Sequence, residues 1–160
     1  MPDPDAAGSP KDVLRRFFAT LSTGDFAAIG EFFGDDSVWM VNDVARGFPS
    51  ERGRRAIIED FLQPVREGLF EPGDPKIEVV RMIGEGDWVV AETVGRGRLR
   101  NGNAYENFYV FVARISGGQV AFLREYMDTA YAHDVSAGSG SASGDGDEHV
   151  AARLRRLGHD

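Results

Sequence analysis

Cysteine is absent from this sequence. Without it the chain has no disulfide bonds, no thiol nucleophiles and no thiolate metal sites, a composition that fits a reducing compartment. Histidine is also scarce, and His133, His149 and His159 do not follow the spacing of metal ligands. We therefore expect neither a metal site nor another cofactor.

Long apolar runs are missing too. None approaches the roughly 18 residues needed to cross a bilayer, and the start MPDPDAAGSP lacks a basic segment followed by an apolar one. We expect a cytoplasmic protein without a membrane partner. Basic residues are in the minority, 18 against 26 acidic ones, and the resulting charge of −8 repels polyphosphate. Nucleic acid is not an expected partner.

The composition that remains is that of a globular protein. Of 160 residues, 42% are apolar and 11 are phenylalanine, which predicts one domain with a phenylalanine-rich core.

Helical spacing dominates the first part of the chain. Ser9 and Pro10 are suited to the start of a helix, whose predicted buried stripe is Val13, Leu14, Phe17, Phe18 and Leu21. Asp25 can cap a second helix, with Phe26, Ile29, Phe32 and Phe33 on its buried side. Residues 54–62 predict a third helix that ends or bends at Pro64.

Strand patterns occupy residues 37–42 and then 76–83, 87–98, 104–115 and 119–129, while 45–53 reads as a loop. This order predicts an α+β fold, in which a curved, cone-shaped, mostly antiparallel sheet packs against three N-terminal helices. We divide the chain into a flexible arm (1–10), a single domain (11–132) and a Gly/Ser-rich linker with a flexible or helical tail (133–160).

Three stretches carry a resemblance to a known family: "RRFFATLSTGDFAAIGEFFGDDSVW" (15–39), "GRRAIIEDFL" (53–62) and "YVFVARISGGQVAFLREYMDTAYA" (109–132). Together they resemble the nuclear-transport-factor-2-like superfamily, in its SnoaL-like polyketide cyclase and ketosteroid isomerase branch. The resemblance implies cofactor-independent chemistry on hydrophobic intermediates, such as those of antibiotic biosynthesis. It implies fold more strongly than function, because this superfamily holds several activities.

The functional residues of these relatives are only partly present. The isomerase pattern has a tyrosine that donates to the oxyanion, an aspartate that acts as general base, and a second carboxylic acid. In this sequence the corresponding positions are Phe17, Val41 and Val110. Steroid isomerisation of the usual kind is therefore not expected. The related epoxide hydrolases have an arginine and an aspartate near the positions of Thr93 and Gly95, and a third, acidic residue that corresponds to Glu125.

The last hairpin predicts which face Glu125 occupies. A two-residue turn at Gly117-Gly118 pairs Val112 with Leu123, Val110 with Glu125 and Phe108 with Met127 on one face. The other face then carries the pairs Phe111 with Arg124, Tyr109 with Tyr126, and Asn107 with Asp128. A slip of one residue would exchange the two faces.

Because its predicted neighbours are apolar, Glu125 is expected to point into the cone, where burial would raise its pKa toward neutrality. A carboxyl group of this kind suits a general acid or base. The alternative is that Glu125 pairs with an arginine or turns outward at a bulge.

Further candidates lie at the end of the first strand. Asp43 shares a face with Trp39 and Val41 and is a candidate second carboxylate, although acidic residues after strands are commonly turn formers. Asn42 is a candidate for orienting a water or a carbonyl group. The predicted substrate-binding residues are Phe17, Trp39, Val41, Phe108, Val110, Leu123 and Met127.

These observations predict a cofactor-independent cyclase or isomerase acting on a polyketide- or terpenoid-like intermediate. Two alternatives stay open: an epoxide hydrolase or epoxide-opening cyclic-ether synthase, and a non-catalytic binding or scaffold protein. A homodimer is expected through the convex sheet face, to which the predicted register assigns Tyr109, Phe111, Arg124 and Tyr126.

Overall fold

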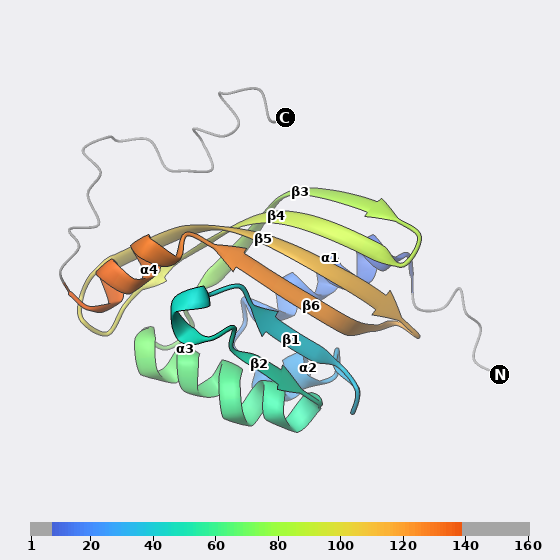
Figure 1. Ribbon diagram of the computed structural model, residues 1–160, viewed down its shortest axis with the longest axis horizontal. Helices are drawn as coiled ribbons and strands as arrows, with labels where there is room; N and C mark the ends of the chain where they lie inside the picture. The colour runs from blue at the N-terminus through green and yellow to red at the C-terminus, as the bar shows by residue number, and fades with distance from the viewer. Residues whose placement is uncertain (1–7, 139–160) are drawn as a thin grey trace.

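The computed structural model describes residues 8–138, which form helices and one sheet (Figure 1). In chain order the elements are α1 (Pro10–Leu21), α2 (Phe26–Gly30), β1 (Val38–Val41), the 3-10 turn η2 (Val44–Arg46), β2 (Ser50–Arg52), the π-helical segment η3 (Ala56–Leu62), α3 (Gln63–Leu69), β3 (Lys76–Glu85), β4 (Trp88–Arg98), β5 (Ala104–Ser116), β6 (Gln119–Met127) and α4 (Thr129–Ser136).

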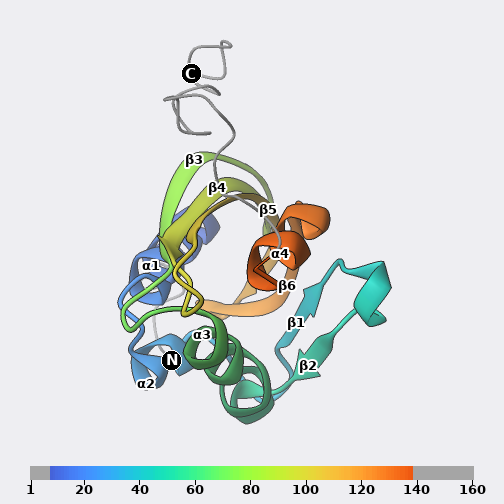
Figure 2. The same cartoon turned by 90° about the vertical axis from the view of Figure 1, so that its left-hand side faces the viewer.

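The six strands form one open, mixed sheet in the order β2-β1-β6-β5-β4-β3. All neighbours are antiparallel except β1 and β6, which run parallel. Figure 2 shows the sheet curving around the N-terminal helices, with α4 across one end. The predicted α+β fold with helices on one side of a curved sheet is confirmed.

Helix α1 forms as its sequence predicts. Ser9 accepts a hydrogen bond from the backbone N–H of Asp12, and the Asp12 carboxylate accepts from the Ser9 backbone in return, a reciprocal cap that satisfies otherwise unpaired donors. The predicted stripe of α1 is buried throughout. Phe17 and Phe18 lie in it, and their rings contact Trp39 and Phe111 of the sheet.

The third helix is longer than predicted. It runs from η3 directly into α3 and ends at Leu69. Pro64 does not end it, because the π-helical segment finishes at Leu62 and leaves Pro64 in the first turn of α3. The helix therefore passes through Pro64 from a π-helical to an α-helical segment without a break.

The register of the last hairpin differs from the prediction. The turn lies at Gly117-Gly118 as expected, but the pairing shifts after Ile115, where Ala121 is an extra residue on β6. This β-bulge moves every later pair by one position. Glu125 consequently faces Phe111, and Met127 faces Tyr109.

The bulge corrects several predicted neighbours. Phe108 and Val110 lie on the outer face of the sheet, so neither is a neighbour of Glu125. Tyr109 and Phe111 lie on the inner face and are buried, so the prediction that placed them on the convex face is wrong. Dimerisation through the convex face stays a prediction, but Tyr109 and Phe111 do not contribute to that face.

Two elements were not predicted. The short strand β2 lies in the stretch 45–53 that was read as a loop, and it pairs with β1. Helix α4 crosses the proposed domain boundary at residue 132 and continues to Ser136. Most of the proposed arm and tail, residues 1–7 and 139–160, lies outside the described residues.

Within residues 8–138, no helix is long and apolar enough to span a bilayer.

Candidate functional site

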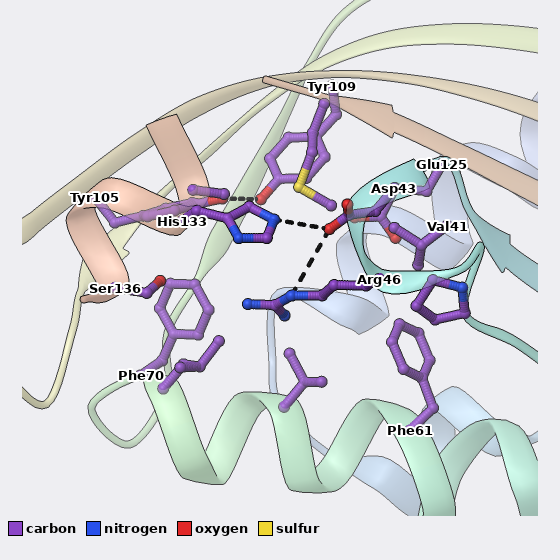
Figure 3. A pocket seen from close by; sticks show the side chains of 15 residues that line it. Val41, Asp43, Arg46, Phe61, Phe70, Tyr105, Tyr109, Glu125, His133 and Ser136 are labelled. Carbon is purple, nitrogen blue, oxygen red and sulfur yellow. Dashed lines mark hydrogen bonds and ion pairs between the residues drawn. The ribbon is translucent and has the colours of Figure 1, made fainter. Parts of the chain in front are cut away.

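A pocket of about 130 Å³ opens between the concave face of the sheet, helix α3, helix α4 and the η2 turn (Figure 3). Most of its wall is apolar or aromatic. The lining residues are Val41, Asp43, Arg46, Pro49, Phe61, Val65, Leu69, Phe70, Tyr105, Tyr109, Glu125, Met127, Ala132, His133 and Ser136.

Glu125 is one of two buried acids that line this pocket. It lies in β6 between Phe111 of β5 and Val41 of β1, and only 8% of its surface is exposed. Burial raises its pKa, and the indole N–H of Trp39, which donates to Oε2 over 2.9 Å, offsets part of this rise. The resulting pKa of Glu125 is about 7. Near neutral pH Glu125 is thus populated in both protonation states, which suits it to give or take a proton.

Two tyrosines of β5 lie beside Glu125. Tyr105 and Tyr109 point to the same face, and their hydroxyl groups hydrogen-bond to each other. Burial raises the pKa of Tyr105 to about 12 and that of Tyr109 well above its usual value, and the charge of Glu125 contributes in both cases. Both phenols therefore stay protonated and can serve as donors.

The amide of Asn107 fixes one end of this pair. Its Nδ2 donates to the carbonyl of Asp128 and to the Tyr105 hydroxyl, each over 3.1 Å, and its Oδ1 accepts from the backbone N–H of Phe108. The two tyrosines have two hydroxyl protons. Only one of these protons is used in the hydrogen bond between the two hydroxyl groups, and among the described residues the other has no acceptor. One hydroxyl proton is left to face the pocket.

A second polar group lies at the mouth of the pocket. Asp43, which is 6% exposed, follows β1, and its Oδ2 lies 2.9 Å from Nε2 of His133 on α4. The Nε atom of Arg46 lies 3.8 Å from the same oxygen. Figure 3 shows both contacts, which run from one oxygen of Asp43 to His133 and to Arg46.

The predicted site residues divide into two groups. Val41, Asp43, Glu125 and Met127 line the pocket as expected. The others do not line it. Trp39 is buried and donates to Glu125, and Phe17 and Leu123 are fully buried in the core. Phe108 and Val110 lie on the outer face, and the backbone N–H of Asn42 donates to the Glu125 carbonyl.

Four pocket-lining residues were not predicted as site residues: Arg46, Tyr105, Tyr109 and His133. The sequence shows that Tyr105, Asn107, Tyr109 and Phe111 alternate along β5 and so share one face. It does not show that this face borders the pocket, because that depends on the bulge at Ala121. His133 required helix α4, for which the cap at Asp128 was the available signal.

No cluster of three or more His, Asp or Glu side chains suited to a metal ion occurs among residues 8–138. The polar groups in the pocket include a carboxyl group, two phenols and an aspartate–histidine pair, which are of the types that serve in general acid–base catalysis.

An open mixed sheet curved around helices, with a pocket at the end closed by α4, is the α+β architecture of nuclear-transport-factor-2-like proteins. The SnoaL-like domain family matches residues 14–123, and the chain belongs to that family. No curated protein matches the sequence.

Solved structures with the same fold are distant in sequence. A nuclear-transport-factor-2-like protein of unknown function from Burkholderia pseudomallei K96243 superposes with a TM-score of 0.71 at 17% identity, over 79% of this chain and 96% of that chain. A candidate SnoaL-like polyketide cyclase from Shewanella denitrificans OS-217 gives 0.66 at 18%, over 82% and 98%. An LEH-like epoxide hydrolase from M. tuberculosis gives 0.62 at 18%, over 80% and 89%.

Proposed function

We propose that this protein is a cofactor-independent isomerase or cyclase that acts on a small hydrophobic substrate by proton transfer through Glu125. The observation that carries the proposal is the position of this carboxyl group, which lies in the wall of an open apolar pocket with a pKa near 7. A scaffold protein has no need of such a group, because a buried acid destabilises the fold.

The chemistry follows from the groups around Glu125. In its ionised form Glu125 removes a proton from a carbon next to a carbonyl group, and in its protonated form it returns the proton to another atom. Negative charge accumulates on the substrate oxygen in between. The hydroxyl proton left over in the Tyr105–Tyr109 pair is the donor for that oxygen.

The size of the pocket limits what can enter. A dry cavity of roughly 150 Å³ holds one benzene molecule, and the present pocket measures about 130 Å³. One six-membered ring, or the reacting end of a longer molecule, fits. Polyketide- and terpenoid-like intermediates have such parts, and the family supports this class of substrate.

Cyclohexanone is a suitable probe, because it is one apolar ring with exchangeable protons next to its carbonyl group. In D2O, loss of these protons can be followed by NMR. We expect the wild type to accelerate exchange and Glu125→Gln to lose roughly 100-fold or more of that acceleration. Glu71→Gln, at an exposed position, is the matched control. Equal exchange by wild type and Glu125→Gln would refute the role of Glu125.

Epoxide opening is a second candidate, which requires another polar group in the pocket. The Asp43–His133 pair meets this requirement. In this reaction protonated Glu125 gives its proton to the epoxide oxygen as a carbon–oxygen bond breaks. Water attacks the carbon and loses a proton to Nδ1 of His133, which later returns a proton to Glu125. Formation of the diol from styrene oxide by the wild type, together with its loss in Glu125→Gln, would favour this candidate over isomerisation.

A further inference from the structure

The two sides of the pocket mouth are joined by Asp43 and His133. Asp43 belongs to the turn that follows β1, whereas His133 is on α4, 90 residues later in the sequence. Both side chains line the pocket that contains Glu125. Neither has a role in the proposed proton transfer at Glu125, so their presence there calls for another explanation.

The hydrogen bond between them determines which nitrogen of His133 carries a proton. An aspartate carboxylate only accepts hydrogen bonds, so Nε2 must be the protonated nitrogen. In the neutral ring Nδ1 is then an acceptor. Figure 3 shows this second nitrogen turned away from Asp43, and within residues 8–138 it has no hydrogen-bond partner.

The position of His133 is fixed by the contacts of its helix. The carboxylate of Asp128 accepts from the backbone N–H of Tyr131, and the Tyr131 hydroxyl accepts from the backbone N–H of Glu106. At the other end of α4, side-chain amides of Asn101 and Asn103 donate to the carbonyl of Val135. An acceptor on such a supported helix has a defined direction, which recognition of a ligand group requires.

Asp43 itself is not satisfied. Its Oδ1 is buried and has no hydrogen-bond partner among the described residues, although Oδ2 receives both His133 and the more distant Arg46. A buried acceptor without a partner costs on the order of 1–3 kcal/mol. Such a cost points to a role for Asp43 other than stabilising the fold.

We propose that Asp43 holds His133 so that Nδ1 accepts a hydrogen bond from a hydroxyl group of the substrate. The pocket then selects hydrophobic molecules with a hydroxyl group placed opposite the atom that reacts at Glu125. This inference rests on the proposed function, because it takes the pocket to be the substrate site. Asp43 is a positioning residue, and His133 contacts the substrate.

Phenol and toluene test this inference, because they are single rings of nearly equal shape that differ in the hydroxyl group. Their dissociation constants can be measured by NMR titration of the wild type, His133→Phe and Asp43→Asn. We expect the preference for phenol over toluene to fall about tenfold in both variants, as the loss of one hydrogen bond predicts, while toluene affinity is retained. Glu71→Gln, at an exposed position outside the pocket lining, should keep the preference.

The state of the ring gives an independent readout. In 15N NMR spectra of protein with labelled histidine, His133 should show the tautomer with its proton on Nε2, which faces Asp43, and the Nδ1 signal should shift when phenol is added. In Asp43→Asn the amide can donate to Nε2, so the proton should move to Nδ1. A structural role alone would not produce the shift with phenol.

The outcomes separate the two proposals. If toluene binds but the preference for phenol is the same in wild type, His133→Phe and Asp43→Asn, the role of His133 is overturned while the apolar pocket stands. If neither ring binds to the wild type, the pocket is not a substrate site, and both this inference and the proposed function fail.

Discussion

The indole N–H of Trp39 donates to Oε2 of Glu125 over 2.9 Å, and this contact joins the strand after the second helix to the last strand of the sheet. The two residues are 86 positions apart in the sequence but belong to neighbouring parallel strands. Burial and the indole act on the acid in opposite directions, and burial is the larger influence. The contact between β1 and β6 therefore offsets part of the effect of burial on the pKa of Glu125.

The first prediction concerns this contact. Trp39→Phe removes the donor and leaves burial unopposed, so the pKa of Glu125 should rise above 7. The titration can be followed by carbon NMR of labelled glutamate. Trp88→Phe is the matched control, because Trp88 is 46% exposed and belongs to the far strand β4. An unchanged midpoint in Trp39→Phe would mean that the hydrogen bond has no influence on ionisation.

The second prediction concerns stability and pH. The pKa of Glu125 is raised from 4.5 to about 7 on folding, so between these values the folded state binds more protons than the unfolded state. Its free energy of unfolding must fall as the pH rises through this window and stay low above it. Glu125→Gln lacks this loss. The stability of the variant relative to wild type should increase by about 3 kcal/mol between roughly pH 4 and pH 8.

Urea denaturation of both proteins at the two pH values measures this difference. The exposed substitution Glu71→Gln should show no comparable dependence on pH. A difference between Glu125→Gln and wild type that does not vary with pH would contradict the raised pKa.

The third prediction concerns the space beneath Tyr109. A Cβ atom at Gly95 would lie 2.9 Å from Cε2 of the Tyr109 ring, and this ring is held by its hydroxyl contact with Tyr105. Gly95→Ala should therefore destabilise the fold by about 1–3 kcal/mol. At Gly68 in α3 no atom lies within 4 Å of an added Cβ, so Gly68→Ala should be neutral or stabilising by up to about 1 kcal/mol. Equal effects in thermal unfolding would contradict this explanation.

The same contact explains a departure from the epoxide hydrolases that the sequence resembles. Gly95 stands near the position where those proteins have an aspartate, and Thr93 near that of an arginine. In this fold Thr93 pairs with Tyr109, whose ring occupies the space above Gly95. An aspartate at position 95 would therefore clash with the Tyr109 ring.

Much of the fold was predictable because helices and long strands have local signals. The stripe of α1, the caps at Ser9 and Asp25 and the turn at Gly117-Gly118 were identified from neighbouring residues alone. The inward direction of Glu125 was also correct. The predicted register was wrong, because the bulge shifts the pairing of β5 with β6 by one residue. The shift changes which residues of β5 share the inner face with Glu125, but Glu125 itself still faces inward.

The site was less predictable because it depends on contacts distant in the sequence. The bulge at Ala121 has no signature in residue type, yet it decides that Tyr109 rather than Val110 lies beside Glu125. His133 joins the pocket only because α4 folds back across the sheet, to a position set by Asn101 in the β4–β5 turn. The face of Asp43 was predicted, whereas its partner was not.

The fourth prediction concerns the attachment of α4. Asn101 and Asn103 each donate a hydrogen bond to the carbonyl of Val135, over 2.9 and 3.0 Å. Replacing both asparagines with alanine removes these bonds, each of which contributes on the order of 1 kcal/mol. Backbone amides of α4 should then exchange with deuterium roughly 10 to 100 times faster, because local opening becomes less costly.

Hydrogen exchange measured by mass spectrometry on peptides from residues 129–136 tests this prediction, and peptides from β6 serve as an internal reference. Asn42→Ala is the matched control, since the Asn42 contact with Glu125 uses its backbone rather than its side chain. Val135 is also buried against the core. If protection of α4 is unchanged in the double variant, this packing rather than the two asparagines holds His133 at the pocket mouth.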